Sequence, residues 1–321
     1  MFLDGSTILV SGGSGSFGQI ATRILLNEYK PKKVIVFSRD EYKQAIMAEE
    51  FNDDRLRFFI GDIRQKERLD RAFEDVDIVI HAAALKRIET TEYNSSETIF
   101  TNVLGSMNVI NAALDSHRVK KVIALSTDKA CSPCTLYGAT KLCMEKMIIN
   151  ANLYRKNRDI SFSCTRYGNV INSKGNVVEL FKRQTYSGKL TVTHKDMTRF
   201  FFSIEDAVKF TISSMEMATG GEIFIPKIPS MKIVDLAKTM CPNCSIEYIG
   251  LRSAEKIHEM LISVDEGRTT VDLGDRYAIL PQHFYFWNDR RKKYNKVEEG
   301  FEYSSDTNNS WITSEELKEI I

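Results

Sequence analysis

The feature that most constrains the fold lies near the amino terminus, where a short apolar run leads into a glycine series. Residues 7–11 read Thr-Ile-Leu-Val-Ser, which predicts a buried strand, and a helical pattern follows Gly18. Between the two, Gly12, Gly15 and Gly18 are spaced as Gly-x-x-Gly-x-x-Gly. Such glycines let the backbone turn tightly and approach a pyrophosphate at the helix amino terminus. Strand, glycine loop and helix in this order predict a dinucleotide-binding unit.

The second predicted strand indicates which dinucleotide is bound. Residues 33–37 read Lys-Val-Ile-Val-Phe, and this strand ends at Ser38 and Arg39 rather than at an acidic residue. A strand-tip acid would bond an NAD ribose, whereas a hydroxyl and a guanidinium suit the 2′-phosphate of NADP. Lys43 lies one helical turn further on and can join them, while Asp40 is better placed to cap the following helix. These residues favour NADP.

Two further strands add expected cofactor contacts. Residues 56–60 lead to Asp62, which can bond an adenine amino group, and residues 77–81 lead to three alanines. The alanines either admit a flat group or serve helix–sheet packing, and the sequence leaves both open. We expect one long helix over residues 97–115, from which Asn102 can brace the active-site loop. The full expected cofactor set is Gly12, Gly15, Ser16, Phe17, Gly18, Ser38, Arg39, Lys43, Asp62, Ile63, Ala82, Ala83, Ala84, Asn102, Tyr137 and Lys141.

A helix predicted to begin near Leu136 carries Tyr137 and Lys141, which are four residues apart and therefore share one helix face. A free Tyr titrates near pH ~10, so its use as a base near neutrality needs its pKa lowered by roughly 3 units, or about 4 kcal/mol. The ammonium of Lys141, helped by a cationic cofactor ring, is suited to lower it. Because Tyr and Lys at this spacing are common, the pair taken alone can equally be an accident of the helix.

Three polar residues precede that helix, at the carboxyl end of a strand predicted over residues 121–125. Open α/β sheets bind their ligands at this edge. Thr127 is placed to hydrogen-bond the hydroxyl that Tyr137 deprotonates, and Asp128 with Lys129 supplies an acid/base pair that a simple alcohol dehydrogenase does not need. The alternative is a solvated loop pair. The catalytic candidates are Thr127, Asp128, Lys129, Tyr137 and Lys141.

Composition excludes several classes of protein. The 321 residues are 43% hydrophobic, enough for a core with more than one lobe, and 44 basic against 43 acidic residues give a net charge of +1. Neither nucleic acid nor an anionic membrane is indicated by so balanced a charge. Because no apolar run approaches the ~20 residues of a membrane span and no leader precedes the first strand, we expect a soluble cytoplasmic protein.

The six cysteines are expected to be reduced thiols. Two Cys-x-x-Cys pairs, Cys131/Cys134 and Cys241/Cys244, have the spacing of zinc ligands, but zinc needs both pairs to converge and the first lies among the catalytic candidates. Neither pair opens a thioredoxin-like unit. We therefore expect no metal site and no redox function.

Alternating strands and helices predict a doubly wound parallel α/β sheet of Rossmann type. A further strand is expected over residues 160–166, after which the rhythm loosens into short strands and helices. We assign residues 1–170 to the NADP-binding domain and 171–321 mainly to a smaller α/β substrate lobe. Since no flexible linker separates them, the two are expected to interleave, with segments near 200–220 returning to the first domain.

Together these motifs resemble a known family. The chain resembles the extended short-chain dehydrogenases/reductases at the glycine series 12–18, Ser38-Arg-Asp40, His81-Ala-Ala-Ala-Leu-Lys86, Ser126-Thr-Asp-Lys-Ala130, Tyr137-Gly-Ala-Thr-Lys141 and Arg166-Tyr-Gly-Asn169. More narrowly, it is similar nearly end to end to the inverting UDP-N-acetylglucosamine 4,6-dehydratases of the pseudaminic acid pathway. Thr-Asp-Lys at 127–129 is the most specific match, because ordinary hexose 4,6-dehydratases carry Asp-Glu there.

The resemblance implies a UDP-N-acetylglucosamine substrate, a homo-oligomer (dimer or hexamer) and a division of roles. Tyr137 removes the C4 hydroxyl proton as NADP⁺ takes the C4 hydride, Lys129 removes the C5 proton, and Asp128 protonates the departing C6 hydroxyl. Hydride then returns to C6, and C5 is reprotonated on the opposite face. A lysine base needs a lowered pKa, which partial burial and nearby Lys141 are expected to provide. By the same resemblance, the UDP-sugar site is lined by Lys86, Asn169, Arg199, Arg252 and Glu255.

Three segments depart from the family pattern. Residues 88–92 read Ile-Glu-Thr-Thr-Glu, Arg252-Ser-Ala-Glu-Lys256 replaces Arg-Pro-Gly-Glu-Lys, and Asn-Ser-Lys-Gly at 172–175 replaces Gly-Ser-Arg-Gly. These departures leave the exact sugar and product open. The alternatives are a partial dehydratase that releases a 5,6-ene sugar, a UDP-hexosamine 4-epimerase, which needs no proton transfer at C5, and a non-catalytic NADP-binding regulator.

Overall fold

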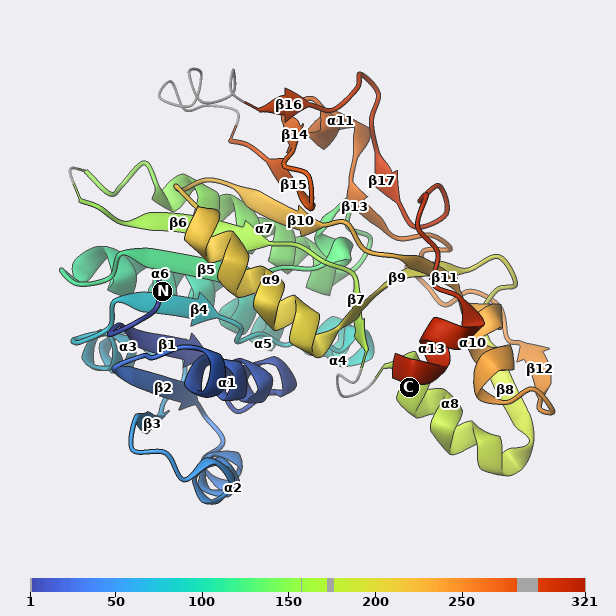
Figure 1. The fold of residues 1–321 in the computed structure, drawn as a ribbon, viewed down its shortest axis with the longest axis horizontal. Helices are drawn as coiled ribbons and strands as arrows, with labels where there is room; N and C mark the ends of the chain where they lie inside the picture. The colour runs from blue at the N-terminus through green and yellow to red at the C-terminus, as the bar shows by residue number, and fades with distance from the viewer. Residues whose placement is uncertain (1, 157, 172–175, 282–293, 321) are drawn as a thin grey trace.

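The computed structural model describes residues 2–156, 158–171, 176–281 and 294–320, which form a large sheet flanked by helices and a smaller lobe (Figure 1). The strands of the large sheet are β1 (Thr7–Ser11), β2 (Lys33–Ser38), β3 (Leu56–Ile60), β4 (Ile78–His81), β5 (Lys121–Leu125), β6 (Ser161–Thr165), β10 (Ile223–Pro226), β14 (Thr270–Asp272), β15 (Arg276–Ile279) and β16 (Asn295–Lys296). They lie in the order β16-β14-β15-β10-β6-β5-β4-β1-β2-β3.

Seven of these strands, from β3 to β10, are parallel to their neighbours, and β15, β14 and β16 extend the sheet antiparallel. The chain winds outwards from β1 in both directions, so the order reverses between β1 and β4. The predicted doubly wound α/β sheet is confirmed. Such a reversal opens a crevice at the carboxyl ends of the strands, where this architecture binds ligands.

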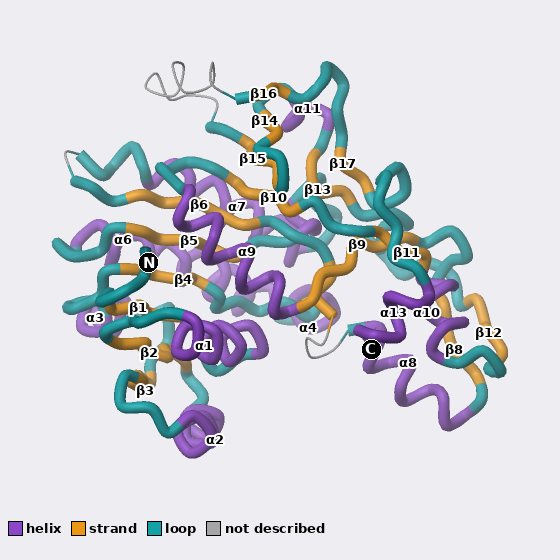
Figure 2. Tube along the Cα trace, viewed as in Figure 1, coloured by secondary structure: helices purple, strands orange, loops and turns teal. Residues whose placement is uncertain are grey.

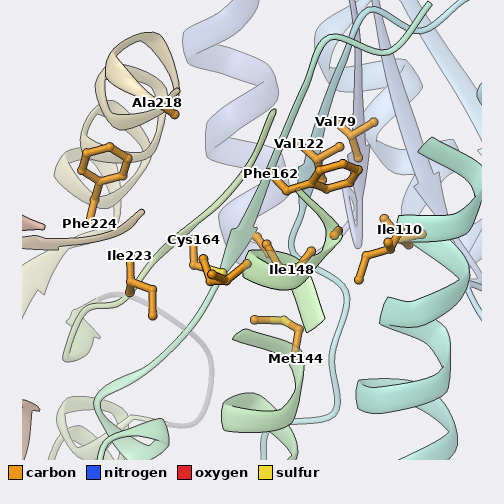
Figure 3. Close-up of a cluster of buried hydrophobic side chains, with 14 of the residues drawn as sticks. Val79, Ile110, Val122, Met144, Ile148, Phe162, Cys164, Ala218, Ile223 and Phe224 are labelled. Atoms are coloured by element: carbon orange, nitrogen blue, oxygen red, sulfur yellow. The ribbon is translucent and has the colours of Figure 1, made fainter. Parts of the chain in front are cut away.

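Helices cover both faces of the sheet (Figure 2). They are α1 (Ser16–Glu28), α2 (Glu41–Phe51), α3 (Lys66–Ala72), α4 (Ile88–Tyr93), α5 (Ser95–Ile99), α6 (Gly105–Asp115), α7 (Leu136–Ala151) and α9 (Ile204–Met217). Alternate side chains of one strand serve opposite faces: Ile8 and Val10 pack with α1 and α9, whereas Leu9 packs with α3, α6 and α7. Figure 3 shows part of the cluster to which Leu9 belongs, in which Met144 and Ile148 of α7 lie against the sheet.

The helix predicted over residues 97–115 is interrupted. A π-helical turn, Phe100–Leu104, separates α5 from α6. Within it, the Asn102 side chain accepts a hydrogen bond from the main-chain amide of Leu85 (2.8 Å) and donates to the Leu85 carbonyl (2.9 Å) and the Thr140 hydroxyl (3.1 Å). A π turn therefore occurs where one side chain ties the helix to the loop after β4, and such turns are frequent near functional sites.

The smaller lobe is built from segments that alternate with returns to the large sheet. Its elements are β7 (Asn169–Ile171), α8 (Val177–Gln184), β8 (Lys189–Val192), β9 (Thr198–Ser203), β11 (Ser230–Lys232), α10 (Ile233–Met240), β12 (Ser245–Tyr248), β13 (Met260–Ile262), α11 (Val264–Gly267), β17 (Tyr303–Ser304) and α13 (Ser314–Ile320). Three small sheets, β11-β9-β7, β12-β8 and β13-β17, hold it together. Between these elements the chain returns to the large sheet through α9, β10, β14 and β15.

Two of the six cysteines are paired with each other. The expectation that every cysteine is reduced is wrong for one pair: Cys241 and Cys244 form a disulfide. The turn after α10, in which the Cys244 amide donates to the Cys241 carbonyl (3.1 Å), brings the two Cα atoms to 5.3 Å. Cys131, Cys134, Cys143 and Cys164 are free thiols.

Among the described helices, none has the length and apolar character needed to span a membrane.

Candidate active site

A cavity of about 970 Å³ runs from the glycine loop, past the carboxyl ends of β1, β4 and β5, to the smaller lobe. It lies where the strand order reverses, as expected for a doubly wound sheet. The five catalytic candidates and the five expected substrate residues all line it. Of the expected cofactor residues, all but Gly18 and Asn102 line it as well. The fold therefore gathers nearly every predicted site residue in one place.

The glycine loop has the shape that a dinucleotide needs. Gly12 adopts φ +69°, and a Cβ atom there would lie 2.8 Å from the main chain of Ala83. A Cβ on Gly18 would lie 2.3 Å from the Gly13 carbonyl oxygen, so Gly18 serves close packing between the loop and α1. Ala82, Ala83 and Ala84 line the cavity opposite this loop. Backbone and methyl groups thus form a wall of small groups, which lets a pyrophosphate approach the main chain closely.

The far end of the cavity holds the residues from which we predict NADP. Asp40 accepts a hydrogen bond from the Lys43 amide (3.0 Å), which confirms it as the amino cap of α2, and it also pairs with the Lys43 ammonium. Arg39 lies 3.6 Å from Asp62, and its side chain is 53% exposed. Because Lys43 is already paired, Arg39 is the cation of this set with most freedom to bind a phosphate.

Asp62 and Asn102 are more committed than the sequence suggests. The Arg64 guanidinium lies 2.7 Å from the Asp62 carboxylate. Asp62 would therefore have to bond an adenine amino group while it keeps this ion pair. Asn102 is buried, and its side-chain amide forms hydrogen bonds with Leu85 and Thr140. It braces the loop after β4, which lines the cavity, and also bonds α7 through Thr140.

At the centre of the cavity, Asp128 joins the other catalytic candidates. Its Oδ1 accepts hydrogen bonds from the Thr127 hydroxyl (2.9 Å) and the Lys129 ammonium (3.0 Å). Its Oδ2 is buried and has no hydrogen-bond partner among the described residues. The pair is therefore not a solvated loop pair, because Asp128 is only 1% exposed. A buried carboxylate oxygen left unpaired at a cavity wall is suited to a substrate hydroxyl.

Tyr137 and Lys141 share the cavity face of α7, but they do not interact as predicted. The Lys141 ammonium donates to the Leu125 carbonyl (2.5 Å) and contacts the Met144 sulfur (3.0 Å). Burial lowers the pKa of Lys141 to about 8. Burial also raises the pKa of Tyr137 to about 12, and the cation that opposes this rise is Lys129. The structure does not show the expected lowering of the Tyr137 pKa by Lys141, because the Lys141 ammonium is directed at the end of β5. The part expected of a cationic cofactor ring stays a prediction.

The pKa predicted for Lys129 also needs correction. Burial by itself would lower it, but the carboxylates of Asp128 and Glu259 outweigh burial and raise the pKa of Lys129 above its ordinary value. Glu259 was missed by sequence reasoning. It precedes β13, is 3% exposed, and places its Oε1 3.3 Å from the Lys129 ammonium. No local motif marks it, because 130 residues separate it from Lys129.

The substrate end is formed by the smaller lobe and the loop after β4. Arg199 is buried and donates to three main-chain carbonyls, those of Thr198 (2.7 Å), Ile257 (2.8 Å) and Lys256 (2.9 Å). It therefore fixes the 256–257 loop as well as lining the cavity. Lys86 lines the same end, and burial, together with Lys129, lowers its pKa. Asn169, the first residue of β7, also lines the cavity, and its Oδ1 has no hydrogen-bond partner among the described residues.

Two of the segments that depart from the family pattern, residues 88–92 and 252–256, meet at this end. Arg252 pairs with Glu89 (3.0 Å) across the cavity mouth, and its amide donates to Glu255 (3.3 Å). Ala254 adopts φ +60°, a conformation that glycine, present in the family pattern, takes without strain. Glu92 accepts from the Leu136 amide (2.6 Å) at the start of α7. Residues 172–175 lie outside the described part of the chain.

Behind the site, Arg166 forms a buried cluster that the sequence did not reveal. It follows β6 and is completely buried, with its guanidinium bonded to Glu145 of α7 and Glu266 of α11. Glu266 in turn accepts from the Cys131 thiol (3.4 Å) in the catalytic loop and from the Ser263 amide (3.1 Å). The cluster ties the catalytic helix to the smaller lobe. Arg166 was noted only as part of a motif.

Known proteins resemble this chain over most of its length. A profile of the family described as polysaccharide biosynthesis protein matches residues 8–281. The chain is 50% identical to a UDP-N-acetylglucosamine 4,6-dehydratase (inverting) from Campylobacter jejuni, over 99% of this chain and 98% of that protein. It is 40% identical to a UDP-glucose 4-epimerase from Rickettsia canadensis, over 87% of this chain and 84% of that protein.

Two solved structures share the fold. The X-ray structure of Pen from Bacillus thuringiensis has a TM-score of 0.90 at 38% identity and is matched over 100% of this chain and 98% of that one. DesIV, a dTDP-glucose 4,6-dehydratase from Streptomyces venezuelae solved with NAD and TYD bound, has a TM-score of 0.71 at 23% identity, over 89% of this chain and 95% of that one. At that identity the second likeness concerns the fold alone.

Proposed function

Because the chain belongs to the polysaccharide biosynthesis protein family, we propose that it is an NADP-dependent UDP-N-acetylglucosamine 4,6-dehydratase that inverts C5. Its product would be a UDP-4-keto-6-deoxy-N-acetylhexosamine for pseudaminic acid or a related surface glycan. The observation that carries the proposal is the Asp128–Lys129 pair, which is held at 3.0 Å in the cavity wall. The identity to an inverting dehydratase from Campylobacter jejuni supports it.

The residues of the cavity divide the reaction between them. A bound dinucleotide supplies a hydride acceptor for C4 and later a hydride donor for C6. Tyr137, which lines the cavity together with Thr127, is the base for the C4 hydroxyl proton. Its raised pKa means that a further cation must lower it before it can act near neutrality, and the nicotinamide ring carries such a charge. Lys141, at the end of β5, is placed to hold the cofactor ribose beside Tyr137.

Dehydration then requires two proton transfers at adjacent carbons. The ketone at C4 acidifies the C5 proton, and Lys129 takes it once its amine is neutral. If Lys129 first gives a proton to Asp128 across their 3.0 Å hydrogen bond, that one step produces both a neutral amine and a carboxylic acid. The acid then protonates the C6 hydroxyl, which leaves as water. The proton arrives on Oδ1, which bonds Lys129, so Oδ1 is the oxygen that gives it to the C6 hydroxyl. Oδ2, buried and without a hydrogen-bond partner among the described residues, is left to accept a hydrogen bond from the substrate.

The test is incubation with UDP-N-acetylglucosamine in D₂O, followed by proton NMR of the product. The expected product carries solvent deuterium at C5 and the original C4 hydrogen at C6. Lys129→Met should still oxidise C4 but stop before water is lost, and Asp128→Asn should slow loss of the C6 hydroxyl while C5 still exchanges. Lys227→Met, which removes a lysine ion pair outside the cavity lining, is the control. A Lys129→Met enzyme that dehydrates normally contradicts the proposal.

A 4-epimerase is the second candidate, since the Rickettsia relatives named UDP-glucose 4-epimerase are 40–42% identical to this chain. Epimerisation needs Tyr137 but no base at C5. A C4-epimer without deuterium at C5 would select this reading. A 5,6-ene sugar with hydrogen back at C4 would instead select a partial dehydratase.

A further inference from the structure

Glu259 is a buried carboxylate in the cavity wall to which the reaction as proposed gives no role. It is 3% exposed, and its Oε1 lies 3.3 Å from the Lys129 ammonium and 3.8 Å from Nε of Arg199. Its Oε2 is buried without a hydrogen-bond partner among the described residues. An incompletely bonded buried carboxylate is costly, so its retention at this position calls for an explanation.

The main chain around Glu259 is held rigidly by the carboxyl-terminal segment. The Glu259 amide donates to the Ser305 hydroxyl (2.9 Å), and the Ser305 amide donates back to the Glu259 carbonyl (2.8 Å). The Ser305 hydroxyl is also bonded to Thr198 (2.7 Å), which precedes Arg199 on β9. Two segments distant in sequence therefore hold the main chain that carries this carboxylate. A carboxylate on a main chain held in this way is suited to orienting another group.

We propose that Glu259 is the positioning residue of the C5 proton transfer: its carboxylate holds the Lys129 amine at the substrate and stabilises the ammonium formed when Lys129 takes the C5 proton. The inference rests on the proposed function, because it assigns Lys129 to C5. In that step the C5–H bond breaks, an N–H bond forms on Lys129, and the electron pair remains with the ketone-stabilised carbanion. At that moment Asp128 still holds the proton meant for the C6 hydroxyl and is neutral, so Glu259 is the carboxylate that remains charged beside the new ammonium.

The charges around Lys129 support a separate role for Glu259. Lys129 is faced by Asp128 beside it, by Glu259 and Arg199 from the smaller lobe, by Lys86 from the loop after β4, and by Tyr137 from α7. Once Asp128 is protonated, two cations and one carboxylate remain around the lysine. Without Glu259, Arg199 and Lys86 would oppose protonation of Lys129. Loss of Glu259 should therefore weaken Lys129 as a base.

The experiment compares Glu259→Gln, Glu259→Asp and the parent by the rate of C5 deuterium exchange against pH, with C4 oxidation measured in parallel. Glu259→Gln should lower the maximal exchange rate about 10- to 100-fold, a part of the 10²–10⁴-fold typical of a lost general base. Its pH midpoint should fall by roughly 1 to 3 units, because a nearby carboxylate no longer favours the ammonium. C4 oxidation should remain near the parent rate, and Glu259→Asp should recover the parent midpoint.

Glu222→Gln is the matched control. Glu222 is also buried, at 4% exposed, but it bonds the 219–220 turn and does not line the cavity. This variant should leave the pH midpoint where the parent has it, whatever its thermal stability. A Glu259→Gln enzyme whose midpoint equals the parent midpoint overturns the role of Glu259. A parent that puts no deuterium at C5 overturns the proposed function, and the role of Glu259 falls with it.

Discussion

The guanidinium of Arg166 lies 2.6 Å from the carboxylate of Glu145, and neither side chain is exposed to solvent. Arg166 follows β6 and Glu145 lies on the catalytic helix α7, so this ion pair fixes the helix that carries Tyr137 and Lys141. Truncating Glu145 leaves the buried guanidinium with one carboxylate, that of Glu266, in place of two. Glu145→Ala should therefore reduce the free energy of unfolding by about 3–5 kcal/mol, measured by chemical denaturation.

An exposed ion pair gives the comparison for that prediction. Arg23 and Glu50 are 2.5 Å apart with side chains 47% and 50% exposed. Because water and salt screen such a pair, Glu50→Ala should cost less than about 1 kcal/mol. Equal losses in the two variants would show that burial of the Arg166–Glu145 pair does not determine its effect.

Glu266 makes part of the stability depend on pH. Burial would raise the pKa of this carboxyl, but Arg166 outweighs burial and lowers it from 4.5 to about 2. A depressed folded-state pKa adds stability that is fully present above the unfolded value and is lost as pH falls from about 4.5 to about 2. The contribution is about 3 kcal/mol. Glu266→Gln should be less stable than the parent at pH ~6, and the difference should shrink towards pH ~2. A difference that stays constant with pH contradicts this assignment.

Gly12 is predicted to be indispensable for cofactor binding. Gly12→Ala places a Cβ 2.8 Å from the Ala83 main chain at φ +69°, and it should abolish NADP binding measured by calorimetry. Gly188 has the same φ of +69°, but nothing lies within 4 Å of its Cβ position. Gly188→Ala should therefore show only the strain of a left-handed alanine, roughly 1–2 kcal/mol of stability, with normal binding. Normal binding by Gly12→Ala would refute the predicted approach of the cofactor to this loop.

Arg39 is predicted to select NADP. The parent should bind NADP more tightly than NAD, because the Arg39 guanidinium can bond a 2′-phosphate. Arg39→Asp should reverse the preference, since an acid at the strand tip bonds the ribose hydroxyl instead. Arg68, which lies over the Phe59 ring outside the cavity lining, provides the control: Arg68→Asp should retain the parent preference. A parent that binds both cofactors equally contradicts the prediction.

Tyr137→Phe removes the proton acceptor at C4 with little change in volume. Oxidation at C4, followed as NADPH absorbance in a single turnover, should slow by about 10²–10⁴-fold. UDP-sugar and cofactor should still bind. Tyr277→Phe, a tyrosine of β15 outside the cavity lining, should oxidise C4 at the parent rate. If Tyr137→Phe also oxidises C4 at the parent rate, another group is the base.

Much of the fold could be predicted because its signals are local. The glycine spacing, the apolar strands and the Asp40 cap each depend on residues a few positions apart. The carboxyl ends of parallel strands share one edge, so Gly12, Ala82 and Thr127 had to meet once the sheet was doubly wound. The long helix over residues 97–115 was predicted without its π turn. In that turn Asn102 forms hydrogen bonds with Leu85 and Thr140, which lie on other segments of the chain.

The electrostatics of the site could not be predicted in the same way. Burial of Lys129 suggested a lowered pKa, but Glu259, brought in by the smaller lobe, raises it. The spacing of Tyr137 and Lys141 suggested a direct interaction, but Lys141 bonds the end of β5. Both corrections have one cause: the interaction between charges depends on their distance and surroundings in space.

The sequence by itself therefore determined the order of elements, the edge of the sheet at which the candidate site lies and the identities of the candidate catalytic side chains. These follow from the hydrophobic period, from glycine conformations and from residue chemistry over short distances. The tertiary structure alone decided which charges surround Lys129 and that Arg166 bonds both Glu145 and Glu266. Those contacts join residues 21 to 130 positions apart, and only the packing of the two lobes brings them within bonding distance.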